Sequence, residues 1–97
     1  MGNQLLSDLM LRLSVWAKGQ ICPGYDPSVW RRDSIGSVIR FSDYGNRDSE
    51  YGWEKDHIDP NGPDELWNLQ PLHWLNNVRK SDQPIGFLSA LLGGNRK

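Results

Sequence analysis

The chain has 97 residues, of which 37% are hydrophobic and 24% charged, and its formal net charge is −1 at pH 7. A chain this short supports one hydrophobic core, so we expect a single domain over residues 1–97. The near-zero charge argues against a protein that holds nucleic acid by bulk positive charge, and no apolar run approaches the roughly 18 residues that a membrane span needs. One cysteine, Cys22, allows neither an intramolecular disulfide nor a zinc site built from cysteine pairs. With no export signal recognisable at the N-terminus, we expect a cytoplasmic protein without membrane contacts.

The charge is unevenly distributed. Residues 51–66 have a net charge of −4, and residues 67–97 have a net charge of +3. An acidic stretch followed by a basic one is compatible with a cation site beside a phosphate-binding surface, and also with ordinary solvated surface. Charge alone favours the second interpretation.

The first expected element is an amphipathic helix over residues 1–19. Apolar side chains recur every three or four residues from Leu5 to Ala17, which is the spacing of one helical face, and Gly19 ends the pattern. Turn-forming residues at 23–27 predict a loop that leads into a short helical turn at 29–32.

Two strands are expected in the middle of the chain. Residues 38–41 have strand character, and a loop at 42–50 leads to an alternating stretch at 51–56 that suits a second strand. Proline and glycine at 60–63 then break regular structure.

The last third of the chain is expected to be mainly helical. We predict a very short strand at 68–70, a helix from about Pro71 to Ser81 with the proline in its first turn, and a short apolar segment at Phe87–Leu92. Helices and antiparallel strands that are grouped along the chain predict the α+β fold class.

His57 stands where the second expected strand runs into a loop. An isolated histidine at such a place is most often a partly exposed residue hydrogen-bonded to a neighbour. Here Asp56 precedes it, so one side chain could hold a metal while the other takes a proton from a water that the metal polarises. Metal-assisted phosphodiester hydrolysis needs this division of labour.

From Trp53 to Asp82 the sequence resembles the HNH nucleases, whose compact unit is two short antiparallel strands and one helix around a single metal ion. The matching segments are 56–58, the loop with Gly62, Asp64 and Leu66, 68–72 and 76–80. Asn68 and Asn77 are nine residues apart, a common spacing between the central asparagine and the helix metal ligand of such nucleases. The stretch from Gly24 to Arg47 also resembles small stand-alone bacterial and phage members. The resemblance implies a ββα-metal core at 51–82.

The resemblance also implies roles for individual residues. His57 would be the general base, and Asp56 and Asn77 would give oxygen ligands to the metal. Asn68 would hydrogen-bond within the loop and hold the backbone of the base, although a plain turn residue before a strand is an equally good interpretation. Oxygen ligands without a thiolate suit Mg²⁺ or Mn²⁺.

His73 lies four residues before Asn77 on the same expected helical face. It could approach the site as a metal ligand or support a ligand, and it could equally be an N-terminal histidine packed beside Trp74. Many HNH nucleases carry two cysteine pairs for a structural zinc, but the corresponding stretches 35–38 and 73–76 contain no cysteine. We therefore expect no structural zinc.

Without a zinc site, apolar packing must supply the stability. The bulkiest candidates for the core, which could alternatively stack on bases, are Trp16, Trp30, Trp53, Trp67 and Trp74.

Basic residues close to the expected site are candidate phosphate contacts. Arg79 and Lys80 follow Asn77 and would line the groove beside the metal. A second set is Arg31, Arg32, Arg40 and Arg47, which could instead pair with Asp33, Asp43, Asp48 and Glu50. Glu50 and Glu54 have no assigned role, although Glu54 is close enough to influence the metal or to brace Arg79.

The function that these residues favour is a Mg²⁺-dependent endonuclease acting on DNA, with RNA left open. A first alternative is an HNH-like module without cleavage that binds nucleic acid or protein. A second is a subunit of a phage packaging or defence complex. In that complex a protein partner, or a second copy of the chain, would bind the leucine-rich N-terminal helix and the Phe87–Leu92 segment.

Overall fold

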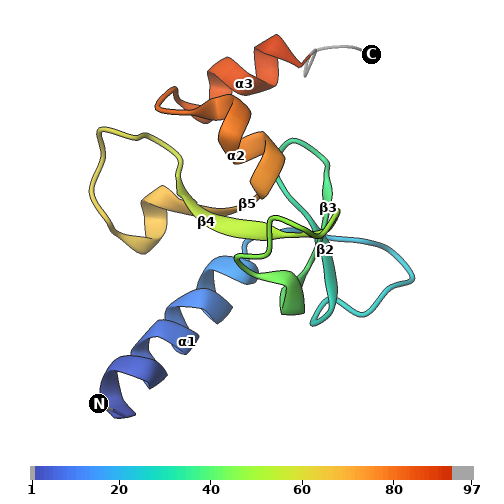
Figure 1. Cartoon of the computed structure of the whole chain (residues 1–97), viewed down its shortest axis with the longest axis vertical. Helices are drawn as coiled ribbons and strands as arrows, with labels where there is room; N and C mark the ends of the chain where they lie inside the picture. Colours follow the sequence, from blue (N-terminus) through green and yellow to red (C-terminus); the bar gives the residue numbers. More distant parts are fainter. Residues whose placement is uncertain (1, 93–97) are drawn as a thin grey trace.

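Figure 1 shows a computed structural model of the chain, which describes residues 2–92. In these residues three α-helices accompany two antiparallel sheets, which confirms the α+β class. No helix among them is long and apolar enough to cross a membrane. In chain order the elements are α1 (Gly2–Trp16), β1 (Gln20–Ile21), β2 (Trp30–Arg32), β3 (Val38–Arg40), η1 (Phe41–Asp43), β4 (Trp53–His57), η2 (Leu66–Asn68), β5 (Leu69–His73), α2 (Trp74–Lys80) and α3 (Ile85–Leu91).

Helix α1 enters the core only with its C-terminal end. Val15 and Trp16 are buried there and Leu11 packs against them. Of the apolar face predicted between Leu5 and Ala17 only Trp16 is buried, because the helix packs through its C-terminal end and turns Leu11 and Val15 to the core. The helix ends at Trp16, three residues before Gly19. Its N-terminal part projects from the body of the protein (Figure 1). The apolar side chains that it exposes are Leu5, Leu6, Leu9, Met10 and Leu13.

The core joins α1 to both sheets. Its buried members are Val15, Trp16, Ile39, Trp53 and Leu69. The rings of Trp16 and Trp53 have centroids 5.1 Å apart, and the indole N–H groups donate to the carbonyl oxygens of Pro27 and Phe41, respectively. Two of the five tryptophans thus form the core as expected, whereas Trp67 is 68% exposed.

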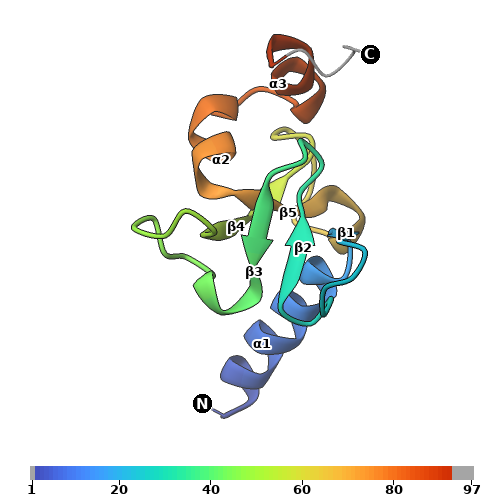
Figure 2. The same cartoon turned by 90° about the vertical axis from the view of Figure 1, so that its right-hand side faces the viewer.

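The first sheet has the strand order β1-β2-β3. The helical turn expected at 29–32 is wrong, because Trp30 pairs with Arg40 on one side and Arg32 pairs with Gln20 on the other. Strand alternation then puts Trp30 and Arg32 on the outer face, opposite the face that buries Ile39. Figure 2 shows β2 and β3 between α1 below and α2 above.

The second sheet is the pair β4-β5, in which Asp56 lies opposite Gln70. Strand β4 agrees with the predicted strand at 51–56, but β5 is longer than expected and runs through Pro71 to His73. The helix therefore begins at Trp74. A proline fits here because each strand of a two-stranded sheet has one edge without a pairing partner, where a missing N–H costs nothing.

Asp33 links the two halves of the protein. Its fully buried carboxylate accepts hydrogen bonds from the N–H groups of Ile35, Gly36 and Ser37 at 3.1, 2.9 and 2.8 Å. The His73 N–H and the Asn76 side-chain amide donate to its other oxygen, both at 2.9 Å. The turn after β2 is thereby joined to the start of α2. A carboxylate that receives this many donors tolerates burial without a cationic partner.

Replacing Asp33 by alanine should therefore destabilise the whole fold. The substitution leaves several buried donors without an acceptor, and we expect a loss of about 3–5 kcal/mol in the free energy of unfolding. Urea denaturation followed by tryptophan fluorescence measures it. Asp26→Ala is the matched control, because Asp26 is exposed and, within residues 2–92, its carboxylate accepts hydrogen bonds from Ser28 alone. This substitution should lower the free energy of unfolding by less than about 1 kcal/mol. Equal urea midpoints for the Asp33 variant and the wild type would contradict the linking role.

Candidate active site

The candidate site lies where one face of β4 meets α2. Alternation along the strand sends Glu54 and Asp56 to the same side, while Trp53 goes to the core. Asn77 and Lys80 lie one turn apart on α2 and contact these two carboxylates. Figures 1 and 2 show α2 following β5 directly and standing next to the sheet. The structure thus brings the two expected metal ligands, Asp56 and Asn77, to one interface.

Glu54 orients the Asn77 side chain. The Arg47 guanidinium grips the Glu54 carboxylate with two hydrogen bonds of 2.6 and 2.9 Å, and the Asn77 Nδ2 donates to Glu54 Oε1 at 2.7 Å. The hydrogen bond from Arg47, aided by that from Asn77, holds the pKa of Glu54 below its ordinary value, so the carboxylate stays ionised. Because the amide nitrogen is used here, the Asn77 Oδ1 atom receives no hydrogen bond from the described part of the chain. That oxygen can therefore accept a further contact.

Asp56 is 7% exposed, and each of its oxygens accepts one hydrogen bond. Gln70 Nε2 donates to Oδ2 at 3.0 Å, and Lys80 Nζ donates to Oδ1 at 3.2 Å. Lys80 also donates to the His57 carbonyl oxygen at 2.9 Å and is only 1% exposed. The expectation that Lys80 lines a groove and contacts phosphate is therefore wrong, since its ammonium is buried against Asp56.

The donor atoms are of the type that a hard cation binds. A carboxylate oxygen has two lone pairs, so Asp56 can accept a further contact beside those from Gln70 and Lys80. Asn77 adds a neutral oxygen, and Mg²⁺ commonly takes only one or two protein ligands and keeps water on its other positions. Residues 2–92 hold no cluster of three or more His, Cys, Asp or Glu side chains that could bind a metal. A cation here would thus rest on the Asp56 and Asn77 pair.

His57 leaves β4 on the face opposite Asp56. Its side chain is 42% exposed, and its Nε2 atom lies 3.2 Å from the Asp64 carboxylate, which is itself exposed. The two neighbouring side chains therefore point in different directions, as the motif predicts. An imidazole with one exposed partner remains accessible to water and substrate.

Asn68 organises the loop that follows His57. Its buried side chain accepts from the Asp59 N–H and donates to the carbonyl oxygens of Asp59 and Pro63, each at 3.0 Å. Gly62 permits this approach, because a Cβ atom there would come within 2.6 Å of the Asn68 amide nitrogen. The loop bonds are those that the family resemblance implies for this residue.

His73 caps helix α2. Its Nδ1 atom accepts from the Leu75 N–H at 3.0 Å, and its Nε2 atom lies 2.7 Å from the Glu50 carbonyl oxygen, to which it donates. Both ring nitrogens are therefore in use, which removes His73 from the candidate metal ligands. The open alternative of an N-terminal histidine beside Trp74 fits, since the two rings stack with centroids 5.9 Å apart.

The arginines divide into structural and exposed residues. Arg31 donates to backbone carbonyls of Ala17, Gly19 and Pro27 and ties α1 to β2. Two more arginines pair with carboxylates, Arg40 with Asp43 and Arg47 with Glu54. Arg32 and Arg79 are exposed. Arg79 is the member of the Arg79 and Lys80 pair that remains a candidate phosphate contact.

Sequence reasoning missed the coupling of Arg47 to Glu54 and Asn77. A signal for Glu54 was present, because a residue two before Asp56 on a strand must share its face. Nothing comparable marked Arg47, which comes from the loop before β4 and reaches Glu54 only in the folded chain.

Comparison with known proteins gives no match: no family model, curated protein or solved structure corresponds to the chain. The function must therefore be inferred from the chemistry of the chain's own residues.

Replacing Lys80 by methionine should destabilise the protein by about 3–5 kcal/mol, because Asp56 would be left as a buried charge without its partner. Thermal and urea unfolding measure the loss. Lys55→Met is the matched control, since Lys55 precedes Asp56 on β4 but points to the opposite face and is half-buried; its effect should be about 1 kcal/mol or less. A surface lysine that contacts DNA would instead leave the free energy of unfolding unchanged in the Lys80 variant.

Proposed function

We propose that this protein is a metal-dependent endonuclease of the HNH type that hydrolyses phosphodiester bonds in DNA. The observation that carries the proposal is the Asn77 side chain, whose nitrogen is held by Glu54 so that its oxygen is left for a cation at the interface that also contains Asp56. The order of β4, β5 and α2 along the chain supports it, because a ββα-metal unit has two antiparallel strands followed by a helix.

In this proposal each residue has a defined task. Asp56 and Asn77 would hold a Mg²⁺ or Mn²⁺ ion, which supplies Lewis-acid stabilisation of the charge that develops on phosphate oxygens. His57 acts as the general base and takes a proton from the attacking water on its Nδ1 atom, because its Nε2 atom faces Asp64. Asp64 orients the imidazole and stabilises the imidazolium that results.

Asn68 and Lys80 hold the backbone around His57, the proposed general base. Asn68 fixes the loop immediately after His57, and Lys80 holds the His57 carbonyl oxygen. These contacts restrain the backbone at His57 and in the loop after it. The imidazole then changes position mainly by rotation about its side-chain bonds. Arg79, exposed two residues after Asn77, contacts the phosphate backbone.

The Lys80 contact also favours a second candidate function, an HNH-like module that does not cleave. An ammonium at Asp56 Oδ1 already balances the charge that a divalent cation would balance. The exposed apolar side chains of α1 would suit the protein partner of such a module. Metal binding separates the two functions, since only the nuclease requires it.

The first test is hydrolysis of supercoiled plasmid by the wild type and by His57→Ala in Mg²⁺ or Mn²⁺, with chelator as the negative control. Loss of the general base should lower the rate by about 10²–10⁴-fold and leave the fold intact, because His57 is outside the core. Asp64→Ala should lower the rate less than His57→Ala, because it removes only the exposed partner of the imidazole and leaves the base itself. Cleavage by His57→Ala at the wild-type rate would remove His57 from this role.

The second test is Mn²⁺ binding by isothermal titration. Asp56→Asn and Asn77→Ala each take away a proposed ligand, so both should bind the ion at least about 10-fold more weakly than the wild type. Glu54→Gln should weaken binding as well, because it releases the Asn77 amide. Asn61→Ala is the matched control on an exposed loop. Unchanged affinity in the three site variants would show that the ion binds elsewhere.

A further inference from the structure

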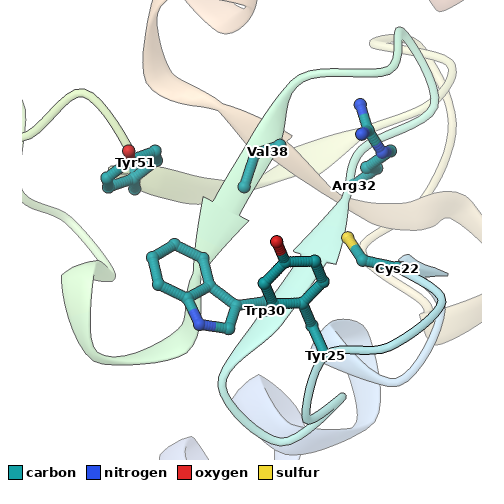
Figure 3. A pocket seen from close by; sticks show the side chains of 6 residues that line it. All are labelled: Cys22, Tyr25, Trp30, Arg32, Val38 and Tyr51. Atoms are coloured by element: carbon teal, nitrogen blue, oxygen red, sulfur yellow. The ribbon is translucent and has the colours of Figure 1, made fainter.

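A hollow of about 330 Å³ opens on the outer face of the β1-β2-β3 sheet, away from the β4 and α2 interface. Figure 3 shows the six side chains arranged around it, which are Cys22, Tyr25, Trp30, Arg32, Val38 and Tyr51. Three of them are aromatic, one is an arginine, and none is acidic. Its volume falls at the lower end of the range of about 300–1,000 Å³ that is typical of pockets for small ligands.

Two of the three aromatic rings pack against each other, and the third is exposed. Tyr51 packs edge-on against Trp30 with ring centroids 5.1 Å apart and an interplanar angle of 87°. The Arg40 guanidinium, 5.6 Å from the Trp30 ring centre and paired with Asp43, borders the same ring. Tyr25 is 65% exposed. These three aromatic side chains thus lie outside the hydrophobic core, and Tyr25 presents apolar surface to solvent.

The strand register places positive charge beside the rings. Trp30 and Arg32 alternate onto one face of β2, with their pairing partners Arg40 and Val38 next to them on β3. Arg32 is exposed, and within residues 2–92 it donates one hydrogen bond, to the Gly36 carbonyl oxygen at 3.0 Å. Most of its donors are therefore free for an anionic ligand.

The hollow adjoins a second one on the side of α2. Val38 and Tyr51 also line this second hollow of about 350 Å³, which is bordered by Glu50 and reaches Asn76 and Arg79 on α2. Arg79 is exposed and follows Asn77 by two residues. One strand of nucleic acid could thus pass from α2 across Tyr51 to the outer face of the sheet, with an arginine near each end.

We infer that the hollow around Trp30 binds an unpaired nucleobase of a nucleic acid strand. The base stacks on Tyr25 and Trp30, and Arg32 contacts the adjoining phosphate. Sheet faces that carry aromatic and arginine side chains bind single strands in this manner, because every base has a π-face, whereas bases stacked within a duplex cannot lie on a protein ring. The inference rests on the proposed function for the identity of the ligand as nucleic acid, and it adds a site that cleavage itself does not require.

The test measures binding without metal, so that cleavage plays no part. Fluorescence anisotropy follows a labelled single-stranded DNA oligonucleotide and a hairpin duplex of the same composition, in chelator, across a salt series. The variants are Tyr25→Ala and Arg32→Ala, with Tyr25→Phe to restore the ring. Trp67→Ala is the matched control, because Trp67 is as exposed as Tyr25 but lies in η2 outside the hollow. Both changed positions are exposed, and thermal unfolding checks that each variant keeps the wild-type midpoint.

We expect the wild type to prefer the single strand over the duplex. Tyr25→Ala should weaken single-strand binding by about 5- to 100-fold, and Tyr25→Phe should restore it. Arg32→Ala should weaken binding and lower the slope of log K against log salt by about 0.7, the value for one phosphate on a single strand. Trp67→Ala should bind as the wild type does.

Three results would overturn the inference: no measurable single-strand binding by the wild type, equal affinity for duplex and single strand, or wild-type affinity in both hollow variants. Plasmid hydrolysis measured in parallel keeps this test separate from that of the proposed function. If cleavage is intact and the variants bind the single strand as the wild type does, the base-binding role of the hollow is rejected and the nuclease proposal stands. Absent cleavage with the expected loss of single-strand binding rejects the nuclease and supports the hollow.

Discussion

The buried carboxylate of Asp33 is the contact on which the arrangement of this small protein depends. Within residues 2–92 it has no cationic partner, and its charge is balanced by N–H donors from the turn after β2 and from the start of α2. All five donors lie in the stretches 35–38 and 73–76. One carboxylate thus links two segments that are far apart along the chain. Since α2 carries Asn77, the position of the candidate site follows from this link.

Strand β4 serves the core and the site at once, because consecutive side chains point to opposite faces. Trp53 closes the core, and Glu54 on the other face turns the Asn77 amide. The side chains of the site are consequently positioned by the same strand that contributes to the core. A small protein gains from this arrangement, since it has few residues to spare for a separate scaffold around its functional groups.

The sequence predicted those features that depend on local periodicity or on short motifs. Helix α1 and strand β4 appear near their expected positions, and the Asn68 contacts match those implied by the resemblance. Strand β2 and the extension of β5 through Pro71 were missed, because strand partners distant along the chain decide both. The burial of Lys80 escaped prediction for the same reason, since only the folded chain brings it to Asp56.

The acidic segment 51–66 illustrates how folding changes the meaning of a charge count. Its net charge of −4 suggests a surface that repels phosphate. In the structure, however, two of its carboxylates are neutralised by cations from outside the segment, Glu54 by Arg47 and Asp56 by Lys80. Electrostatic repulsion of a polyanion at the β4 and α2 interface is therefore weaker than the sequence implies.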